Sequence, residues 1–276
     1  MGENAQLITA NLITLVIDSE VYKVPSSHVS YQQIKWILLR AEVIDWEEIK
    51  ELADAARAVQ LWGNGSLTVI DGEICHNETP IHNVLTGKIL QGMREGENVQ
   101  PFVLFLENLL RNPSNNAINE LYLFMEKAQL PLTEDGHFLA YKNVTEDYKD
   151  RHSRTFDNRV GQVCQIARQQ VDDDRRNTCS YGLHFCALHY LQEMWGFTGR
   201  TMIVKINPAD VVAIPYDYDN AKGRTCRYEV VAEVSAGERL EKNFSKKAIW
   251  TGDAEDEEEL EDDSYASYDE DQIDNI

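Results

Sequence analysis

Thiol and imidazole side chains gather in one short stretch of the sequence. Cys179, His184, Cys186 and His189 lie close together, and Cys226 follows further along the chain. Thiolate sulfur and imidazole nitrogen are the ligands that Zn²⁺ prefers, four at a time in a closed structural site. The paired Cys-x-x-Cys spacing of zinc fingers and ribbons is absent. These five residues are therefore candidate metal ligands that lack the spacing typical of zinc modules.

Three interpretations of this cluster stay open. On a strand, His184 and Cys186 share one face, and we favour interior packing by a buried thiol and a hydrogen-bonded imidazole. A structural zinc site is the second interpretation. The third is catalysis by a Cys–His pair, in which the imidazole activates the thiol. We expect no cofactor, with zinc as the alternative.

Arginine side chains form a second group that could do chemistry. A guanidinium group binds phosphate through two parallel hydrogen bonds, so clustered arginines can hold a phosphate or a nucleotide. No glycine-rich phosphate loop accompanies them. The candidates are Arg151, Arg154, Arg159, Arg224 and Arg227.

A catalytic use of this region would resemble that of an ADP-ribosyltransferase. Such enzymes pair an Arg or a His with a hydroxyl group and a Glu on separate strands. The residues of these types are His152 or Arg154, Ser180 or Tyr181, and Glu229. These residue types are common and their spacing decides little, so we expect that the protein is not an enzyme.

These candidates lie in residues 131–250, which we predict to be a β-rich α+β module. Short apolar segments indicate strands, and one short helix is expected at 187–195. Mixed short strands favour an α+β layer over a doubly wound sheet. The expected strands cover residues 138–141, 160–166, 181–186, 201–206, 211–214 and 227–234.

Residues 1–130 are predicted to be a strand-and-helix domain that mediates interactions. Two hairpins are expected, at 12–24 and at 67–75, where Asp71 and Gly72 favour a two-residue turn. Apolar residues at helical spacing predict several helices, whose apolar stripes we interpret as core. The helices are expected at 31–40, after Asp45, from Thr79 or Pro80 to about Met93, at 102–110, and after Ser114.

The charge of the chain is strongly negative and unevenly placed. Its 276 residues include 47 acidic and 26 basic side chains, for a net charge of −21. Thirteen acidic residues and no basic ones lie in 253–276, so this segment carries −13 and the rest −8. Such a segment buries too little apolar surface to offset its chain entropy, and we predict a disordered acidic tail over 251–276. It keeps the chain in solution; the alternatives are a docking peptide for a host protein and a mimic of nucleic acid.

The same composition excludes several classes of protein. Nucleic-acid phosphates are bound by clustered Lys and Arg, so a chain this acidic is not a general nucleic-acid-binding protein. No apolar run approaches the roughly 20 residues of a membrane-spanning helix, and we expect no secretory signal. Five cysteines, an odd number, favour reduced thiols in a cytoplasm.

Six segments follow one another in a specific order. They are NPSNNAINELY at 112–122, LPLTEDGHFLAYK at 130–142, TFDNRVG at 155–161, GLHFC at 182–186, VKINPADVV at 204–212 and NAKGRTCRYE at 220–229. Together they resemble the rIIB-like protein family of tailed bacteriophages. The resemblance covers about residues 7–235 and does not include the acidic tail.

The resemblance implies a role but no catalytic chemistry. Members of this family are early phage proteins of the host cytoplasm, associated with protection against exclusion by resident prophages and with control of lysis timing. They act with a larger rIIA-type partner protein and are linked to the host envelope or nucleoid. No enzymatic activity comes with the family, so no catalytic residues are implied. Self-association is a further expectation for such an interaction protein.

Overall fold

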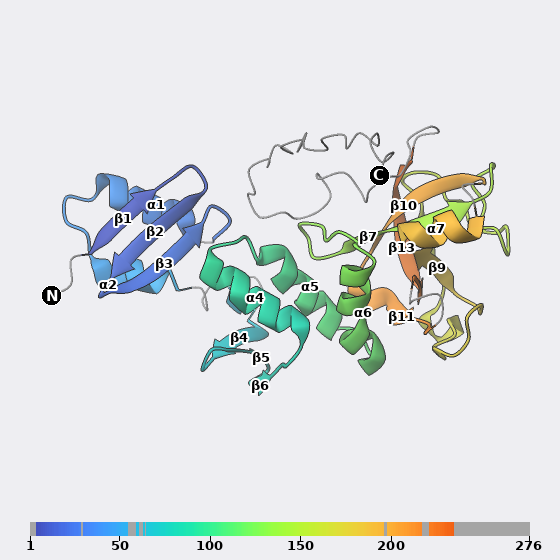
Figure 1. Ribbon diagram of the computed structural model, residues 1–276, viewed down its shortest axis with the longest axis horizontal. Coiled ribbons are helices and arrows are strands. Elements are labelled where there is room, and N and C mark those ends of the chain that lie inside the picture. Colours follow the sequence, from blue (N-terminus) through green and yellow to red (C-terminus); the bar gives the residue numbers. More distant parts are fainter. Residues whose placement is uncertain are drawn as a thin grey trace, which may run out of the picture.

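The chain combines helices with antiparallel sheets, in groups rather than in strict alternation, which makes this an α+β fold, as predicted (Figure 1). The order along the chain is a small sheet with two helices, a second small sheet with three helices, and a larger sheet. The computed structural model describes residues 4–28, 30–54, 59–60, 63, 65–195, 198–216 and 221–234.

The N-terminal sheet has three antiparallel strands in the order β1-β2-β3, packed against two helices (Figure 1). The bounds are β1 Ala5–Ile8, β2 Leu12–Ile17, β3 Glu20–Pro25, α1 Tyr31–Arg40 and α2 Trp46–Leu52. Alternate residues of β2, namely Ile13, Leu15 and Ile17, are buried because successive side chains of a strand point to opposite faces. Asp45 caps α2 as predicted, and its carboxylate accepts two backbone amides of the first turn.

A second three-stranded sheet, in the order β4-β5-β6, and three helices follow. The bounds are β4 Leu67–Ile70, β5 Glu73–His76, β6 Thr79–Pro80, α4 Val84–Glu95, α5 Gln100–Leu110 and α6 Asn115–Lys127. The expected helix start at Thr79 or Pro80 is wrong, since these residues form β6 and pair with β5. α4 begins after Asn83 because Asn83 and Thr86 each accept the other's backbone amide through a side-chain oxygen.

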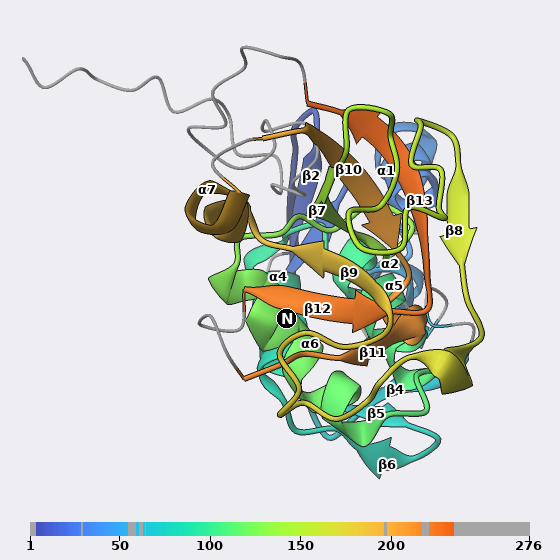
Figure 2. The same cartoon turned by 90° about the vertical axis from the view of Figure 1, so that its right-hand side faces the viewer.

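The C-terminal sheet has seven strands, each antiparallel to its neighbours, in the order β11-β12-β9-β7-β10-β13-β8 (Figures 1 and 2). The bounds are β7 Phe138–Val144, β8 Val163–Gln165, β9 Leu183–Cys186, α7 Leu188–Trp195, β10 Arg200–Ile206, β11 Val211–Ala213, β12 Lys222–Thr225 and β13 Arg227–Glu233. Short 3₁₀ turns occur at Arg168–Gln170 and Pro208–Asp210. β12, which the sequence did not predict, lies beside β9, with Lys222 opposite Cys186 and Arg224 opposite His184.

Buried apolar side chains form two main clusters. One lies within the N-terminal unit, over residues 13–53. The other includes residues from 59 to 230 and joins helices α4 to α6 to the seven-stranded sheet. Side chains on both sides of residue 130 therefore share one cluster. The domain boundary at that residue stays a prediction.

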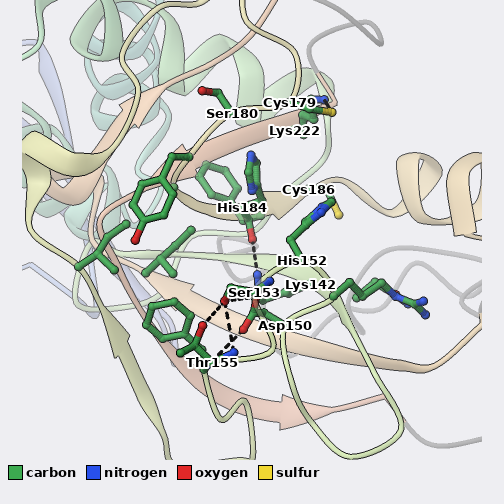
Figure 3. A pocket seen from close by; sticks show the side chains of 18 of the residues that line it. Lys142, Asp150, His152, Ser153, Thr155, Cys179, Ser180, His184, Cys186 and Lys222 are labelled. Carbon is green, nitrogen blue, oxygen red and sulfur yellow. Dashed lines mark hydrogen bonds between the residues drawn. The ribbon is translucent and has the colours of Figure 1, made fainter.

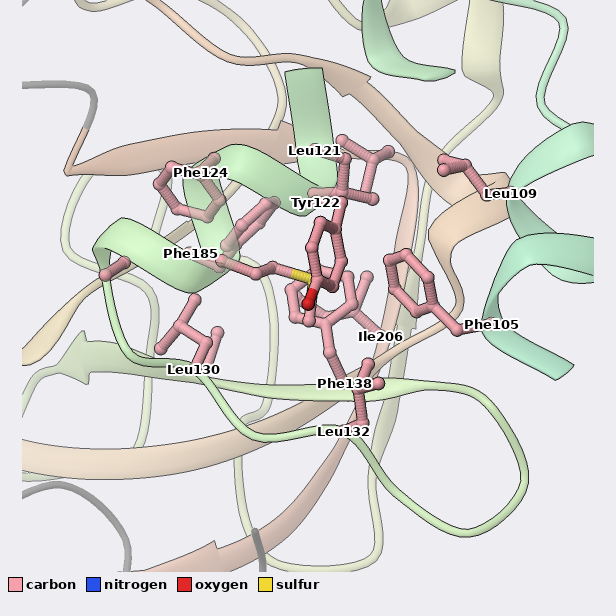
Figure 4. Packing of buried hydrophobic residues seen from close by; sticks show 14 of the residues in the cluster. Phe105, Leu109, Leu121, Tyr122, Phe124, Leu130, Leu132, Phe138, Phe185 and Ile206 are labelled. Carbon is pink, nitrogen blue, oxygen red and sulfur yellow. The ribbon is translucent and has the colours of Figure 1, made fainter. Parts of the chain in front are cut away.

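Phe185 of β9 links the C-terminal sheet to α6 (Figure 4). Its ring meets the rings of Phe124 and Phe138 edge-on, with centroids 5.9 and 5.5 Å away. Gly223 lies opposite Phe185 in β12, and a Cβ atom there would be 2.2 Å from Phe185 Cζ. The sheet buries Phe185 in this position because residue 223 has no side chain.

Two further expectations concern the membrane and the tail. Among the described residues, no helix combines the length and the apolar character needed to span a membrane. The predicted acidic tail at 251–276 lies outside the described residues.

Candidate functional site

A cavity of about 500 Å³ lies against the C-terminal sheet, beneath two of its loops (Figure 3). Strands β7, β9 and β12 contribute to its walls, together with the loops at 150–156 and 179–182. This volume is typical of small-molecule binding sites. Its apolar lining comes from Phe156, Ile166, Tyr181, Leu183, Tyr190 and Leu191.

Lys142 of β7 places a buried ammonium group at the cavity. The residue is only 8% exposed. Its Nζ donates to the backbone carbonyl oxygen of His184 at 3.0 Å and lies 5.2 Å from the centroid of the Tyr228 ring. Among the residues that the structure describes, no carboxylate forms an ion pair with this group. Burial lowers the pKa of Lys142 from its ordinary value, because a charge is costly away from water.

Lys222 of β12 brings a second cation to the cavity. It is 3% exposed, and its Nζ lies 3.9 Å from Cys179 Sγ and 5.6 Å from the centroid of the Tyr190 ring. Cys179 itself is exposed, on the loop that forms one side of the cavity. The nearby ammonium group makes this thiol a poor position for a metal cation.

His184 and Cys186 of β9 both line the cavity, and both are neutral at ordinary pH. Burial, together with the Lys142 and Arg224 cations, lowers the pKa of His184 to about 3. Burial raises the pKa of the Cys186 thiol to about 12, and its Sγ donates to the carbonyl oxygen of Tyr141 at 3.5 Å. The thiolate is the reactive form of cysteine, so this environment does not activate Cys186.

Asp150 shapes the loop on one side of the cavity. Its carboxylate accepts the backbone amides of Ser153 at 2.7 Å, Arg154 at 3.2 Å and Phe156 at 2.9 Å, and the Ser153 hydroxyl at 2.7 Å. Burial raises the pKa of Asp150, but the hydrogen bonds from Phe156 and Ser153 outweigh it and the net pKa is lowered. Asp150 therefore stays ionised and holds the loop in shape.

Arg224 holds the loop on the other side. Its guanidinium is fully buried and donates to the carbonyl oxygens of Asp172 at 2.8 Å, Asp174 at 2.8 Å and Asn177 at 2.6 Å. Hydrogen bonds from Ser180 and Asn177 lower the pKa of Asp172 to about 2. These contacts fix the backbone that leads into Cys179 and the cavity wall.

The five candidate arginines do not converge on one place. Arg151 lines the cavity and donates to Asn143 Oδ1 and the Thr198 carbonyl oxygen. Arg224 lies outside the lining and is held by the carbonyl groups of the loop. The others also lie outside the lining: Arg154 pairs with Asp147 and Arg159 with Asp157, and Arg227 is exposed on β13. Phosphate binding by this group stays a prediction.

The candidate metal ligands are brought together only in part. Cys179, His184 and Cys186 line the cavity, whereas His189 is exposed on α7 and Cys226 Sγ lies 3.8 Å from Asp210 Oδ1. Across the described ranges, no three His, Cys, Asp or Glu side chains are grouped as a metal ion requires. Zinc content, measured by elemental analysis of the purified chain, is the direct test of the structural zinc alternative.

The residues considered for an ADP-ribosyltransferase-like reaction are also divided. His152, Ser180 and Tyr181 line the cavity. Arg154 and Glu229 do not, and Glu229 is exposed on β13 opposite Val163. The hydroxyl and imidazole groups therefore share one space, from which the proposed glutamate is absent.

Sequence reasoning missed both lysines of the cavity. Lys142 lies on the same face of β7 as Phe138 and Ala140, where an apolar residue is expected. A lysine at such a position is a signal that a sequence analysis can use. Lys222 belongs to β12, whose polar sequence gives no strand pattern. No comparable signal marks it.

Together, the fold and the cavity define an α+β protein with buried lysines beneath two tethered loops. A family model described as Bacteriophage T4 protein rIIB matches residues 4–238. Protein rIIB of Enterobacteria phage T4 is 38% identical over 224 residues, which cover 81% of this chain and 71% of that protein. No solved structure matches the chain. The chain belongs to the bacteriophage rIIB family, which confirms the resemblance found in the sequence.

Proposed function

We propose that this chain acts inside the infected bacterium by binding other proteins and has no enzymatic activity. Its proposed effects are those that the family resemblance implies, namely protection against exclusion by resident prophages and control of lysis timing. Its first proposed partner is the larger rIIA-type protein of the same phage. The proposed location is the host cytoplasm, at the periphery of the membrane or the nucleoid.

The observation that carries this proposal is a set of large apolar side chains that the N-terminal unit exposes. Trp36 and Leu39 of α1 are 59% and 63% exposed, and Val43, just beyond the helix, is 85% exposed. Residues three apart share a helix face. Exposed apolar surface of this kind is typical of protein interaction sites.

The open face of the N-terminal sheet adds a second apolar surface. Leu7 pairs with Thr14, and Val21 pairs with Val16, so all four residues lie on one face of the sheet. Leu7 is 63% exposed and Val21 is 62% exposed. This face is opposite to the one that packs against α1 and α2.

The chemistry of the cavity supports the proposed absence of enzymatic activity. The high pKa of Cys186 keeps this cavity thiol protonated. The carboxylate of Asp150 is engaged by loop amides rather than placed for proton transfer.

Capture of the rIIA-type protein tests the proposed interaction. We expect a chain with Trp36→Ser and Leu39→Ser to capture at least tenfold less of it from infected cells, and to lose the ability to support phage growth on a lysogenic host. The matched control is Gln32→Ser with Gln33→Ser, two exposed positions on the same helix. Equal capture by the two variants would contradict the proposal.

A second copy of the chain and a host protein bound by the acidic tail are the other proposed partners. Sedimentation of the purified chain measures self-association directly. Capture experiments with and without residues 253–276 separate tail-dependent partners from those that bind the folded region.

A further inference from the structure

We propose that the cavity beneath the loops at 150–156 and 179–182 binds a nucleoside diphosphate, with its phosphates toward Lys142 and its base among the aromatic side chains. This inference goes beyond the proposed protein-binding role and does not depend on it. It also uses residues other than the arginine group from which phosphate binding was first considered.

The first argument is the charge state of Lys142. An ammonium group buried to this degree has lost most of its hydration, and one carbonyl oxygen and one ring face replace only part of it. The Asp150 carboxylate attracts Lys142 electrostatically, but among the described residues no carboxylate forms a direct ion pair with it. An anionic ligand in the cavity would supply a direct partner.

The second argument is the balance of charge around the cavity. Its described lining includes three cationic side chains, Lys142, Arg151 and Lys222, and a single carboxylate, that of Asp150. Three loop amides and one hydroxyl already occupy the Asp150 oxygens. In a chain whose net charge is −21, a cation-lined cavity is a local exception. The ligand that it favours is an anion.

The third argument is the apolar part of the lining. An inorganic anion gains nothing from aromatic walls, whereas a planar base stacks on them. Phe156, Tyr181 and Tyr190 offer such surfaces. The hydroxyl groups of Ser153 and Thr155 also lie at the cavity (Figure 3). An aromatic ring joined to phosphate groups matches both parts of the cavity.

The fourth argument is that the cavity is formed before any ligand binds. Asp150 fixes one loop and Arg224 fixes the backbone that leads into the other. Binding to loops that are already ordered costs less conformational entropy than ordering them on binding. Neutral His184 adds an uncharged hydrogen-bonding ring to the wall.

Equilibrium dialysis of the full-length chain tests the proposal with ADP and UDP as probes, and with adenosine and inorganic pyrophosphate as partial probes. We expect at least one diphosphate to bind saturably, and each partial probe to bind at least tenfold more weakly. Lys142→Met should weaken diphosphate binding at least tenfold while the chain stays folded, because Met fills a similar volume without a buried charge. The matched control is Lys205→Met, which removes a cation that pairs with Asp135 outside the cavity.

Cys179 provides a second measurement on the native chain. It is exposed and lines the cavity, whereas Cys75, Cys164, Cys186 and Cys226 are buried. The diphosphate that binds should slow alkylation of Cys179 by a maleimide at least fivefold, as read by peptide mass. Absence of saturable binding by both diphosphates, absence of protection by a bound one, or equal binding of pyrophosphate would overturn the proposal. So would unchanged affinity in folded Lys142→Met.

Discussion

At the scale of single residues, the partly buried His184 ties the stability of the protein to pH. Its pKa falls from 6.5 to about 3 on folding, chiefly through burial. The unfolded chain therefore takes up a proton on this ring near pH 6.5, which the folded chain resists until about pH 3. Stability contributed by neutral His184 is complete above pH 6.5 and is lost as the pH falls toward 3.

Replacing His184 should make the protein less sensitive to acid. Between pH 8 and pH 5, the free energy of unfolding of His184→Gln should fall by about 2 kcal/mol less than that of the native chain, since the ring no longer resists protonation. Urea unfolding at the two pH values measures this difference. The exposed His189→Gln serves as the control and should follow the native chain. Parallel pH dependence for all three chains would contradict the prediction.

The comparison of sequence with structure is also instructive for single residues. The interpretation of His184 and Cys186 as residues of one strand face followed from the period of two along a strand, and both residues do line one cavity. The candidate arginines did not come together, because Arg154 and Arg159 pair with nearby carboxylates and Arg224 is held by backbone carbonyl groups. The lysines that reach the cavity come from strands 80 residues apart, Lys142 and Lys222. Nearness of that kind depends on sheet order, which a single sequence does not reveal.

At the scale of elements, strong local sequence patterns gave correct predictions of helices and hairpins, whereas the polar strand β12 was not predicted. The helix at Tyr31–Arg40 and the hairpin turning at Asp71 and Gly72 carry their signals in a few adjacent residues, and the structure confirms both. β12 carries no such signal, because its burial comes from its neighbours β9 and β11 rather than from its own apolar residues. Its glycine is nevertheless essential to the packing of Phe185.

Two glycine substitutions compare a glycine that packs against a buried ring, Gly223, with one in open space, Gly87. Gly223→Ala should lower the free energy of unfolding by about 1–3 kcal/mol, because the added methyl group overlaps the buried Phe185 ring. Gly87 lies on the exposed face of α4, with no atom near the position of an added Cβ. Gly87→Ala should raise the free energy of unfolding by about 0.5–1 kcal/mol, because alanine loses less backbone entropy than glycine in a helix. Chemical denaturation of both variants provides the measurement. A neutral Gly223→Ala would mean that Phe185 moves aside freely.

At the scale of the whole molecule, the two apolar clusters define what unfolds together. The smaller cluster ends at residue 53, and the larger begins at residue 59. Within the larger one, Leu121, Phe124 and Met125 of α6 share a core with Phe138 of β7 and Phe185 of β9 (Figure 4). The sequence could not reveal this sharing, because an apolar helix stripe does not show which surface it covers.

Fragments of the chain test where the folding units divide. A fragment of residues 55–276 keeps the larger cluster intact and should unfold in one cooperative transition. A fragment of residues 131–276 lacks α5 and α6, so the face of its sheet that contains Phe185 is exposed to water. It should therefore bind an apolar dye and unfold without a sharp transition. Calorimetry and dye fluorescence measure both properties. A cooperative transition in the shorter fragment would instead place the division at residue 130, and would mean that the contacts of Phe185 with α6 are dispensable for folding of the β-rich module.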